Sequence, residues 1–354
     1  MGTFGTILIA VLVFGFLIFI HEFGHYITAR IFNVTITEFS IGMGPRLFHF
    51  DSKKTGIRYS LALFPIGGFV AMSGEDGKEN TENADDPNRF DRKPAWQRFI
   101  ITAAGAFVNI VAGFLAVTVL TLFINIGNTT VAQFIPTDES GYEISSADSG
   151  LLLGDEIIEV EGNRVFILDQ LSYRVMRHGN EPIDLLVIRN GEEVELFDVI
   201  FPTIEEEGQV FGVMDFRVKR VDKNVGTVIK YSFFKAFLIV KMCWDAIYDL
   251  LSGRYTLAAV SGPVGISGAI GEAAKEGPTS LLYIVTLISI NLGVMNLLPV
   301  PALDGGRLVT LIFEMITRRR VPPRVEGIIN AVGLAVLLAF SFLIMIKDIV
   351  QLII

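Results

Sequence analysis

The chain has 354 residues, of which 51% are hydrophobic and only 19% are charged. This composition excludes an ordinary soluble enzyme and is typical of a protein that crosses a membrane several times. A formal net charge of −9 argues against nucleic acid as a partner. The single cysteine, Cys243, excludes a disulfide framework and a thiolate metal site, so any metal must use histidine and carboxylate ligands.

Four stretches of the sequence are long and apolar enough to span a lipid bilayer. Each covers roughly 20 residues or more, with charge absent or confined to a motif or an end. They run from about Phe4 to Phe32, Phe99 to Ile126, Pro278 to Leu303 and Gly327 to Ile346. We therefore predict a polytopic α-helical membrane protein with four transmembrane helices.

The first of these spans carries the motif His21-Glu22-Phe23-Gly24-His25. Residues four apart lie on one face of a helix with Cβ atoms roughly 6 Å apart, so both imidazoles can reach one tetrahedral zinc ion. Glu22 then lies beside the metal, where a general base is needed for hydrolysis. The pattern predicts metal-dependent hydrolysis within the membrane.

The distribution of basic residues predicts the orientation. Arg318, Arg319, Arg320 and Arg324 crowd the link between the last two spans, which should therefore be cytoplasmic. Counting back places both termini outside the cell, the segment 33–95 inside, and the motif near the cytoplasmic end of its helix.

A separate acidic domain is predicted between the second and third spans. Residues 127–225 contain 20 Asp and Glu against 8 Lys and Arg. Within them, the stretch Gly150–Asn163 is followed by a helical pattern over Ile167–Met176 and by an Asn190-Gly191 turn between two apolar runs, which is typical of a hairpin. The pattern resembles an α+β PDZ domain, a class that binds partners as an added strand. Another small β-rich domain is the alternative.

Residues 226–252 are apolar but contain five charged residues within an arc of about 140° of a helical wheel. This distribution predicts an amphipathic helix at the membrane interface instead of a fifth span. The predicted organisation is therefore a first membrane half (1–126), the PDZ-like domain (127–225), the amphipathic helix with a Gly-Pro-x-Gly-Ile loop (226–277) and a second membrane half (278–354).

The cytoplasmic segment contains an apolar β-like run, Tyr59–Met72, which is interrupted by Pro65 and by Gly67-Gly68. A membrane-associated hairpin that lines the catalytic chamber is one placement, because irregular backbone at that depth must be shielded by protein or a wet cavity. An ordinary cytoplasmic hairpin is the other.

Two histidines leave a catalytic zinc one protein ligand short. Asp304 is the candidate, since acidic residues within spans are expensive and usually functional. Pro299 and Pro301 remove helical donors just before it and should unwind the end of the third span.

Together, these motifs resemble the site-2 protease family of intramembrane zinc proteases. His-Glu-x-x-His in the first span is paired with Asn296-x-x-Pro-x-Pro-x-Leu-Asp304-Gly in a late one, and the RseP-type branch (regulator of sigma-E protease) is the most similar. Four further motifs occur in the same order as in that branch: Gly42-Met-Gly-Pro45, Pro65-Ile-Gly-Gly68, Ala104-Gly-Ala-Phe-Val-Asn109 and Ser261-Gly-Pro-Val-Gly-Ile266. The resemblance covers most of the chain.

The resemblance implies one Zn²⁺ per chain, held by His21, His25 and Asp304, with Glu22 as general base. It also implies regulated proteolysis of single-span membrane proteins, such as anti-sigma factors or signal-peptide remnants, in the inner membrane of a bacterium. We expect the substrate strand to contact residues beside the motifs, namely Asn296, Pro299, Pro301, Gly67 and Gly68. Some relatives carry two tandem PDZ domains, whereas about 100 residues accommodate one here, and its ligand would be a peptide or a carboxyl terminus.

Two alternatives belong to other classes. Gly265-Ile-Ser-Gly268 resembles the nucleophile motif of rhomboid serine proteases, but no histidine follows His178 to act as its base, so we interpret it as a turn before the third span. An inactive membrane scaffold or metal transporter that recruits partners through the PDZ-like domain is the other alternative. Glu22 argues against it, because structural zinc needs four closed ligands and no adjacent base.

Overall fold

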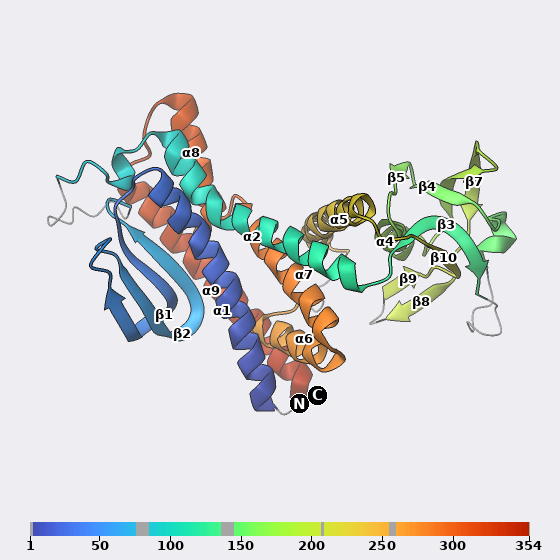
Figure 1. Cartoon of the computed structure of the whole chain (residues 1–354), viewed down its shortest axis with the longest axis horizontal. Helices are drawn as coiled ribbons and strands as arrows, with labels where there is room; N and C mark the ends of the chain where they lie inside the picture. The colour runs from blue at the N-terminus through green and yellow to red at the C-terminus, as the bar shows by residue number, and fades with distance from the viewer. Residues whose placement is uncertain (1–2, 76–84, 136–144, 207–208, 255–259, 354) are drawn as a thin grey trace. The chain divides into compact units, whose positions relative to one another are not determined.

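The structure, a computed structural model, describes residues 3–75, 85–135, 145–206, 209–254 and 260–353 (Figure 1). The chain divides into two compact units. The first contains Met1–Ala116 and Met242–Ile354 and consists mainly of helices, and the second contains Val117–Lys241 and consists mainly of strands.

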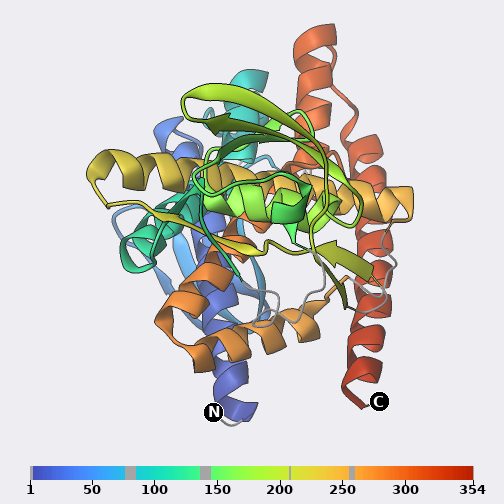
Figure 2. The same ribbon diagram turned by 90° about the vertical axis from the view of Figure 1, so that its right-hand side faces the viewer.

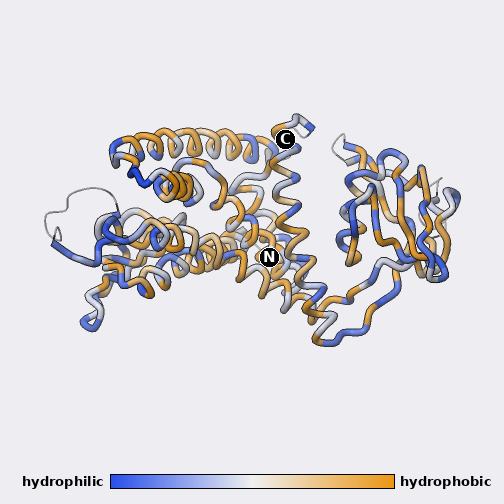
Figure 3. Tube along the Cα trace, turned by 90° about the horizontal axis from the view of Figure 1, so that it is seen from above, coloured by the Kyte–Doolittle hydropathy of each residue, from blue (hydrophilic) through white to orange (hydrophobic). Residues whose placement is uncertain are grey.

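Four helices in the described part of the chain are long and apolar enough to cross a membrane. They are α1 (Thr3–Ile31), α2 (Ala95–Phe123), α7 (Pro278–Leu297) and α9 (Pro323–Ile353). In the most apolar window of α9 only 6% of the residues are buried by protein. Figure 3 shows the corresponding orange colour along most of the helix that ends at the C-terminus. Apolar side chains that protein does not cover are what lipid contact requires, so these helices fit a multi-pass membrane protein.

The predicted third span, Pro278–Leu303, is unwound at its end, as Pro299 and Pro301 predict. Helix α7 ends at Leu297, and a new helix, α8 (Asp304–Thr317), begins after a break of six residues. Pro299 and Pro301 lack the N–H groups that would continue the helix. The reversal is tight: a Cβ on Gly305 would lie 1.9 Å from the carbonyl oxygen of Leu298, so only glycine fits there. Asp304 therefore stands in the first turn of a helix and not within a span.

The glycine-rich run at 265–268 forms part of a helix, and its interpretation as a turn was wrong. Helix α6 (Pro263–Glu276) begins with proline at a position where no N–H is needed. Asp348 of α9 accepts hydrogen bonds from the N–H groups of Gly262 and Gly265, both at 2.9 Å. This contact from a distant helix satisfies two of the free amides at the start of α6 and offsets the low helix propensity of glycine.

Strands β1 (Ile36–Asp51) and β2 (Arg58–Met72) form the β-region that the sequence predicts between the first two spans, and they pack along α1 (Figure 1). Both are long and irregular. Residues 38–41 of β1 pair with 68–71 of β2 and also with 58–61, so the two strands fold back on each other. The segment Gly68–Met72 forms an edge, and among the described residues no strand pairs with it on the side away from β1.

The second unit is built on a sheet in the order β10-β3-β4-β6-β7, with β5 paired to β4. These strands are β3 (Gly127–Phe134), β4 (Glu156–Val160), β5 (Asn163–Arg164), β6 (Ile183–Arg189), β7 (Glu192–Val199) and β10 (Phe216–Arg220). A short hairpin, β8 (Thr203–Glu206) and β9 (Gln209–Gly212), and helix α4 (Leu168–His178) complete the unit, which Figure 2 shows facing the viewer.

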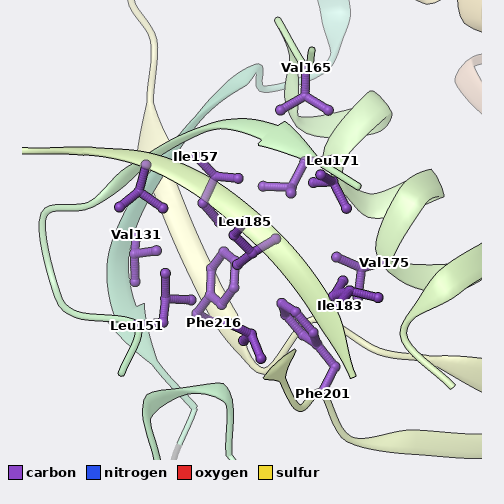
Figure 4. Packing of buried hydrophobic residues seen from close by; sticks show 13 residues of the cluster. Val131, Leu151, Ile157, Val165, Leu171, Val175, Ile183, Leu185, Phe201 and Phe216 are labelled. Carbon is purple, nitrogen blue, oxygen red and sulfur yellow. The ribbon is translucent and has the colours of Figure 1, made fainter. Parts of the chain in front are cut away.

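One apolar core holds this unit together. Side chains from the strands meet Leu171 and Val175 of α4, all of them at most 4% exposed (Figure 4). Leu171 and Val175 lie four apart and therefore on one face of the helix. The predicted hairpin at Asn190-Gly191 is confirmed, because β6 and β7 are joined there with φ of 53° and 89° at the two turn residues. The predicted helix over Ile167–Met176 corresponds to α4.

Helix α5 (Val225–Ser252) has the amphipathic character that its sequence predicts. Lys235 and Asp249 are buried within the protein, at 7% and 1% exposure. The large apolar side chains on the other face are more than half exposed: Val225, Ile229, Phe233, Phe237, Trp244, Tyr248 and Leu251. A helix with a row of large apolar side chains that protein does not cover fits contact with lipid at the interface.

Candidate metal centre

Helix α1 and the start of α8 bring three potential metal ligands together. Nε2 of His21 and Nε2 of His25 lie 3.3 Å apart. Oδ2 of Asp304 lies 3.2 Å from the first nitrogen and 3.3 Å from the second. Among the histidine, cysteine and acidic side chains of the described residues, these three have ligand atoms close enough to one another to hold one metal ion.

The three ligand atoms fit a tetrahedral zinc ion. Bonds of about 2.0–2.1 Å to a tetrahedral centre place the ligand atoms about 3.3–3.4 Å from one another, which is the spacing found here. Oδ2 of Asp304 is buried and has no hydrogen-bond partner among the described residues. Such an oxygen is costly unless a cation or a donor reaches it. Two imidazoles and a carboxylate also form the donor set of many catalytic zinc sites, which keep the fourth position open.

Helix α2 forms the wall behind the two imidazoles. Nδ1 of His25 donates to the carbonyl oxygen of Ile101 at 2.8 Å, which leaves Nε2 free to bind a metal. Gly105, one turn later, makes room for the rings, since a Cβ there would lie 2.3 Å from Nε2 of His25 and 2.9 Å from Cε1 of His21. Gly24 lets the backbones of α1 and α2 approach closely, since a Cβ added there would lie 2.5 Å from the carbonyl oxygen of Ala104.

A cavity of about 400 Å³ opens beside the three ligands. Glu22 lines it, and so does the edge segment Gly68–Met72 of β2. Gly68 packs against Glu22, because a Cβ at Gly68 would lie 2.9 Å from Cγ of the glutamate. The cavity thus brings a carboxylate, the ligand cluster and a strand edge to one place.

Charged residues close the cavity on another side. Arg307, three residues after Asp304 in α8, forms an ion pair with Glu75, and both line the cavity. These two residues and Thr102 also line a second cavity of about 500 Å³, which contains further ion pairs such as Arg98–Glu314 at 2.5 Å. The second cavity therefore adjoins the first at the Arg307–Glu75 pair.

The predicted site residues are not all in one place. His21, Glu22, His25, Asp304 and Gly68 line the same cavity. The remaining residues lie outside its lining. Gly67 packs against Met43, since a Cβ added to Gly67 would lie 2.7 Å from Cε of that methionine. Pro301 packs against Gly333 of α9, since a Cβ added to Gly333 would lie 2.4 Å from Cβ of the proline. Asn296 and Pro299 stand in the last turn of α7 and in the break after it. Their role in substrate binding remains a prediction.

Sequence reasoning missed several residues that shape the site. Gly105 and Asn109 belong to a motif that the sequence singled out, and their spacing of four places them on one face of α2. That spacing was a usable signal, but the face could not be assigned to His21 and His25 before α1 and α2 were packed together. Arg307 was detectable as the residue one helical turn after Asp304, whereas nothing in the sequence pointed to Glu75.

Comparison with known proteins decides the family. The sequence model of peptidase family M50 matches residues 9–340 of this chain. This chain belongs to peptidase family M50. Relatives that are named as zinc metalloproteases align over nearly their whole length with this member of the M50 family: a protein of Fusobacterium nucleatum is 34% identical, with 97% of this chain and 98% of the relative covered. A protein of Clostridium acetobutylicum is 33% identical, and zinc metalloprotease RasP of Geobacillus kaustophilus is 28% identical, each with 98% of both chains covered.

Membership of the M50 family, which is the site-2 protease family, makes this chain a zinc metalloprotease. The predictions of protease activity and of zinc as the cofactor are therefore confirmed. The four apolar helices, together with the family, make it a multi-pass membrane protein.

Proposed function

We propose that this M50 protease hydrolyses peptide bonds within or near the transmembrane segments of single-span membrane proteins. The observation that carries the proposal is the convergence of three ligands beside a cavity lined by Glu22: His21 and His25 stand on α1, which is apolar enough to span the bilayer, and Asp304 reaches them from α8. A soluble protease has no need to build its metal site into such a helix, because charged and polar groups in a span are expensive.

In this proposal, His21, His25 and Asp304 hold the zinc, and Glu22 is the general base. Zinc, when bound, supplies a Lewis acid that activates water and polarises a carbonyl group. Glu22 accepts a proton from the attacking water and delivers it to the amine that leaves. Its place in the cavity wall, next to the ligands in sequence and in space, suits both steps.

The edge of β2 provides a place for the substrate backbone. A transmembrane helix hides its amides in its own hydrogen bonds, so a bound substrate must unwind before it is cut. Gly68–Met72 lines the cavity and has a free edge in the described sheet, so an extended peptide can pair with it as an added strand. The missing side chain of Gly68 lets that strand approach Glu22 closely.

The second unit would serve as a recruitment domain outside the cell membrane. Its acidic composition, its compact core and the helix α4 packed within its strands fit a single PDZ-like domain, which would bind a peptide or a carboxyl terminus. With the basic link at 318–324 on the cytoplasmic side, both termini and this domain would be extracytoplasmic in a bacterial inner membrane. The metal centre would face the cytoplasmic side.

Replacement of Glu22 by glutamine tests the proposed activity. Wild-type protein in membranes should cut a tagged single-span reporter, whereas Glu22→Gln should cut it at least about 10²-fold more slowly, because the base is lost. Zinc content, measured by elemental analysis, should be unchanged. Equal cleavage by both proteins would reject Glu22 as the base, and zinc-loaded wild type that cleaves soluble peptides but no membrane-inserted reporter would reject the proposed substrate class.

A further inference from the structure

We propose that Asn109 is a positioning residue of the metal centre: its side-chain oxygen accepts a hydrogen bond from Nδ1–H of His21 and thereby directs Nε2 of that ring at the zinc. The inference rests on the proposed role of His21 as a ligand. It assigns a function to a residue of α2 that is not among those lining the cavity.

The first observation is the position of the amide. Asn109 is 0% exposed, and its Nδ2 lies 3.3 Å from Nδ1 of His21. Its Oδ1 is also buried and has no hydrogen-bond partner in the part of the chain that the structure describes. A buried carbonyl oxygen without a donor is costly, so this amide needs an arrangement that satisfies it.

The second observation is the direction of the His21 ring. Its Nε2 faces Oδ2 of Asp304 and Nε2 of His25, the other two potential ligand atoms. A neutral imidazole that binds a metal through one nitrogen carries its hydrogen on the other, so Nδ1 of His21 becomes a donor. The group that faces Nδ1–H must then be an acceptor. As placed, Asn109 instead directs the donor Nδ2 at it, so two donors would face each other.

A half-turn of the amide resolves both demands. The oxygen and the nitrogen of an asparagine side chain have nearly the same shape, so rotation about the last side-chain bond exchanges them without moving the backbone. Oδ1 then lies where Nδ2 was, within hydrogen-bond reach of Nδ1–H. One rotation therefore gives the orphaned oxygen its donor and the ligand imidazole its acceptor.

The surrounding helices hold Asn109 in place. Its backbone oxygen accepts from Oγ of Ser289 in α7 at 2.8 Å. Near it, a Cβ on Gly293 of α7 would lie 2.7 Å from the carbonyl oxygen of Ala106, so the two helices are in close contact. Asn109 is thus fixed between α1 and α7, and a fixed acceptor limits the rotation of the His21 ring.

The arrangement matches the one at the other histidine. Nδ1 of His25 is held by the backbone carbonyl of Ile101, and Ile101, Gly105 and Asn109 follow one another at intervals of four on one face of α2. This stripe supplies an acceptor for each imidazole, with a glycine between them to admit the rings. Of the two acceptors, only that of Asn109 is a side chain, so mutation can remove it.

The experiment measures the zinc affinity of the purified full-length protein by competition with a chelator. Asn109→Leu, which keeps the size but removes the acceptor, should weaken zinc binding by about 10- to 100-fold. Asn109→Asp, which keeps an acceptor oxygen, should stay within about threefold of wild type, since a carboxylate also holds a metal-bound histidine. Thr286→Val is the matched control, because its buried hydroxyl donates to the carbonyl oxygen of Leu282 within α7 and, among the described residues, to no group of the metal centre.

Unchanged affinity in Asn109→Leu would overturn the proposal, and so would equal weakening in Asn109→Leu and Asn109→Asp, which would indicate a packing role alone. His21→Ala separates this inference from the proposed function. If His21→Ala loses zinc while Asn109→Leu does not, only the role of Asn109 fails. If His21→Ala binds zinc as well as wild type, the ligand assignment fails and the inference fails with it.

Discussion

At the scale of single residues, the absence of a side chain at Gly105 is as important to the metal centre as the ligands themselves. The two imidazoles occupy the volume that any Cβ at this position would need. Protein interiors are close-packed, so the rings can yield only by leaving the positions from which their nitrogens converge. The zinc affinity of this centre therefore depends on a residue that offers no donor atom.

We predict that Gly105→Ala lowers the zinc affinity by about tenfold or more, the effect expected when the support of a metal ligand is disturbed. Gly15→Ala is the control, because a Cβ at Gly15 of α1 has no neighbour within 4 Å. Chelator competition on the two variants gives the comparison. Wild-type affinity in Gly105→Ala would show that the rings have more freedom than the packing of α1 on α2 implies.

The residues also show what the sequence alone reveals about the site. His21 and His25 were identifiable because one helix fixes their relation through its own periodicity. Asp304 required a further step, since it stands more than 270 residues away and only the shortage of ligands and a family resemblance pointed to it. Gly105 and Asn109 were not assigned, because their role exists only after two helices pack, and no local pattern encodes which faces meet.

At the scale of elements, Pro299 and Pro301 predict that the end of the third span unwinds, and the structure shows the break between α7 and α8 at residues 298–303. The error lies in α6, where a contact between distant segments decides the structure. The glycine-rich run at 265–268 was predicted as a turn, but it lies within this helix. Its first amides are satisfied by Asp348, more than 80 residues away, which no local signal could show.

In the second unit, the loop before β4 is tied to β6 by one ion pair. Asp155 is 1% exposed and accepts from Nε and Nη2 of Arg189 at 2.8 and 2.7 Å, and from the N–H of Leu152 at 2.9 Å. Burial raises the pKa of Asp155, but these hydrogen bonds outweigh burial and hold the pKa below its ordinary value of 3.8. A depressed carboxyl pKa stabilises the folded state above the ordinary value, and that stability is lost as the pH falls below it.

We predict that hydrogen-exchange protection of β4 and β6 decreases as the pH is lowered from about 5 to 3, after correction for the intrinsic exchange rate. Asp155→Asn should reduce this protection at pH 7 by about 1–3 kcal/mol, since it removes a charged acceptor from Arg189. It should also flatten the pH dependence. The surface variant Asp222→Asn should do neither. A pH dependence in Asp155→Asn as steep as in wild type would assign the effect to another group.

At the scale of the whole molecule, the chain combines apolar helices with a separate acidic unit, and the proposed topology assigns them to different compartments. The acidic unit would lie on the extracytoplasmic side of the membrane, and the link at 318–324 would lie on the cytoplasmic side. Single cysteines at Glu193 of β7 and at Arg319, both exposed, test this in a Cys243→Ser background. We predict that a membrane-impermeant maleimide labels position 193 in spheroplasts and labels position 319 only after the membrane is opened. The reverse pattern would contradict the topology.

The central claim is that one zinc ion is held by two imidazoles of α1 and the carboxylate at the start of α8. X-ray absorption at the zinc edge of the purified protein tests it most directly. The account predicts one zinc per chain with nitrogen and oxygen neighbours at about 2.0–2.2 Å, and a loss of most of the metal in Asp304→Ala. Zinc that stays bound at full stoichiometry in Asp304→Ala, with the same spectrum as wild type, would contradict the claim.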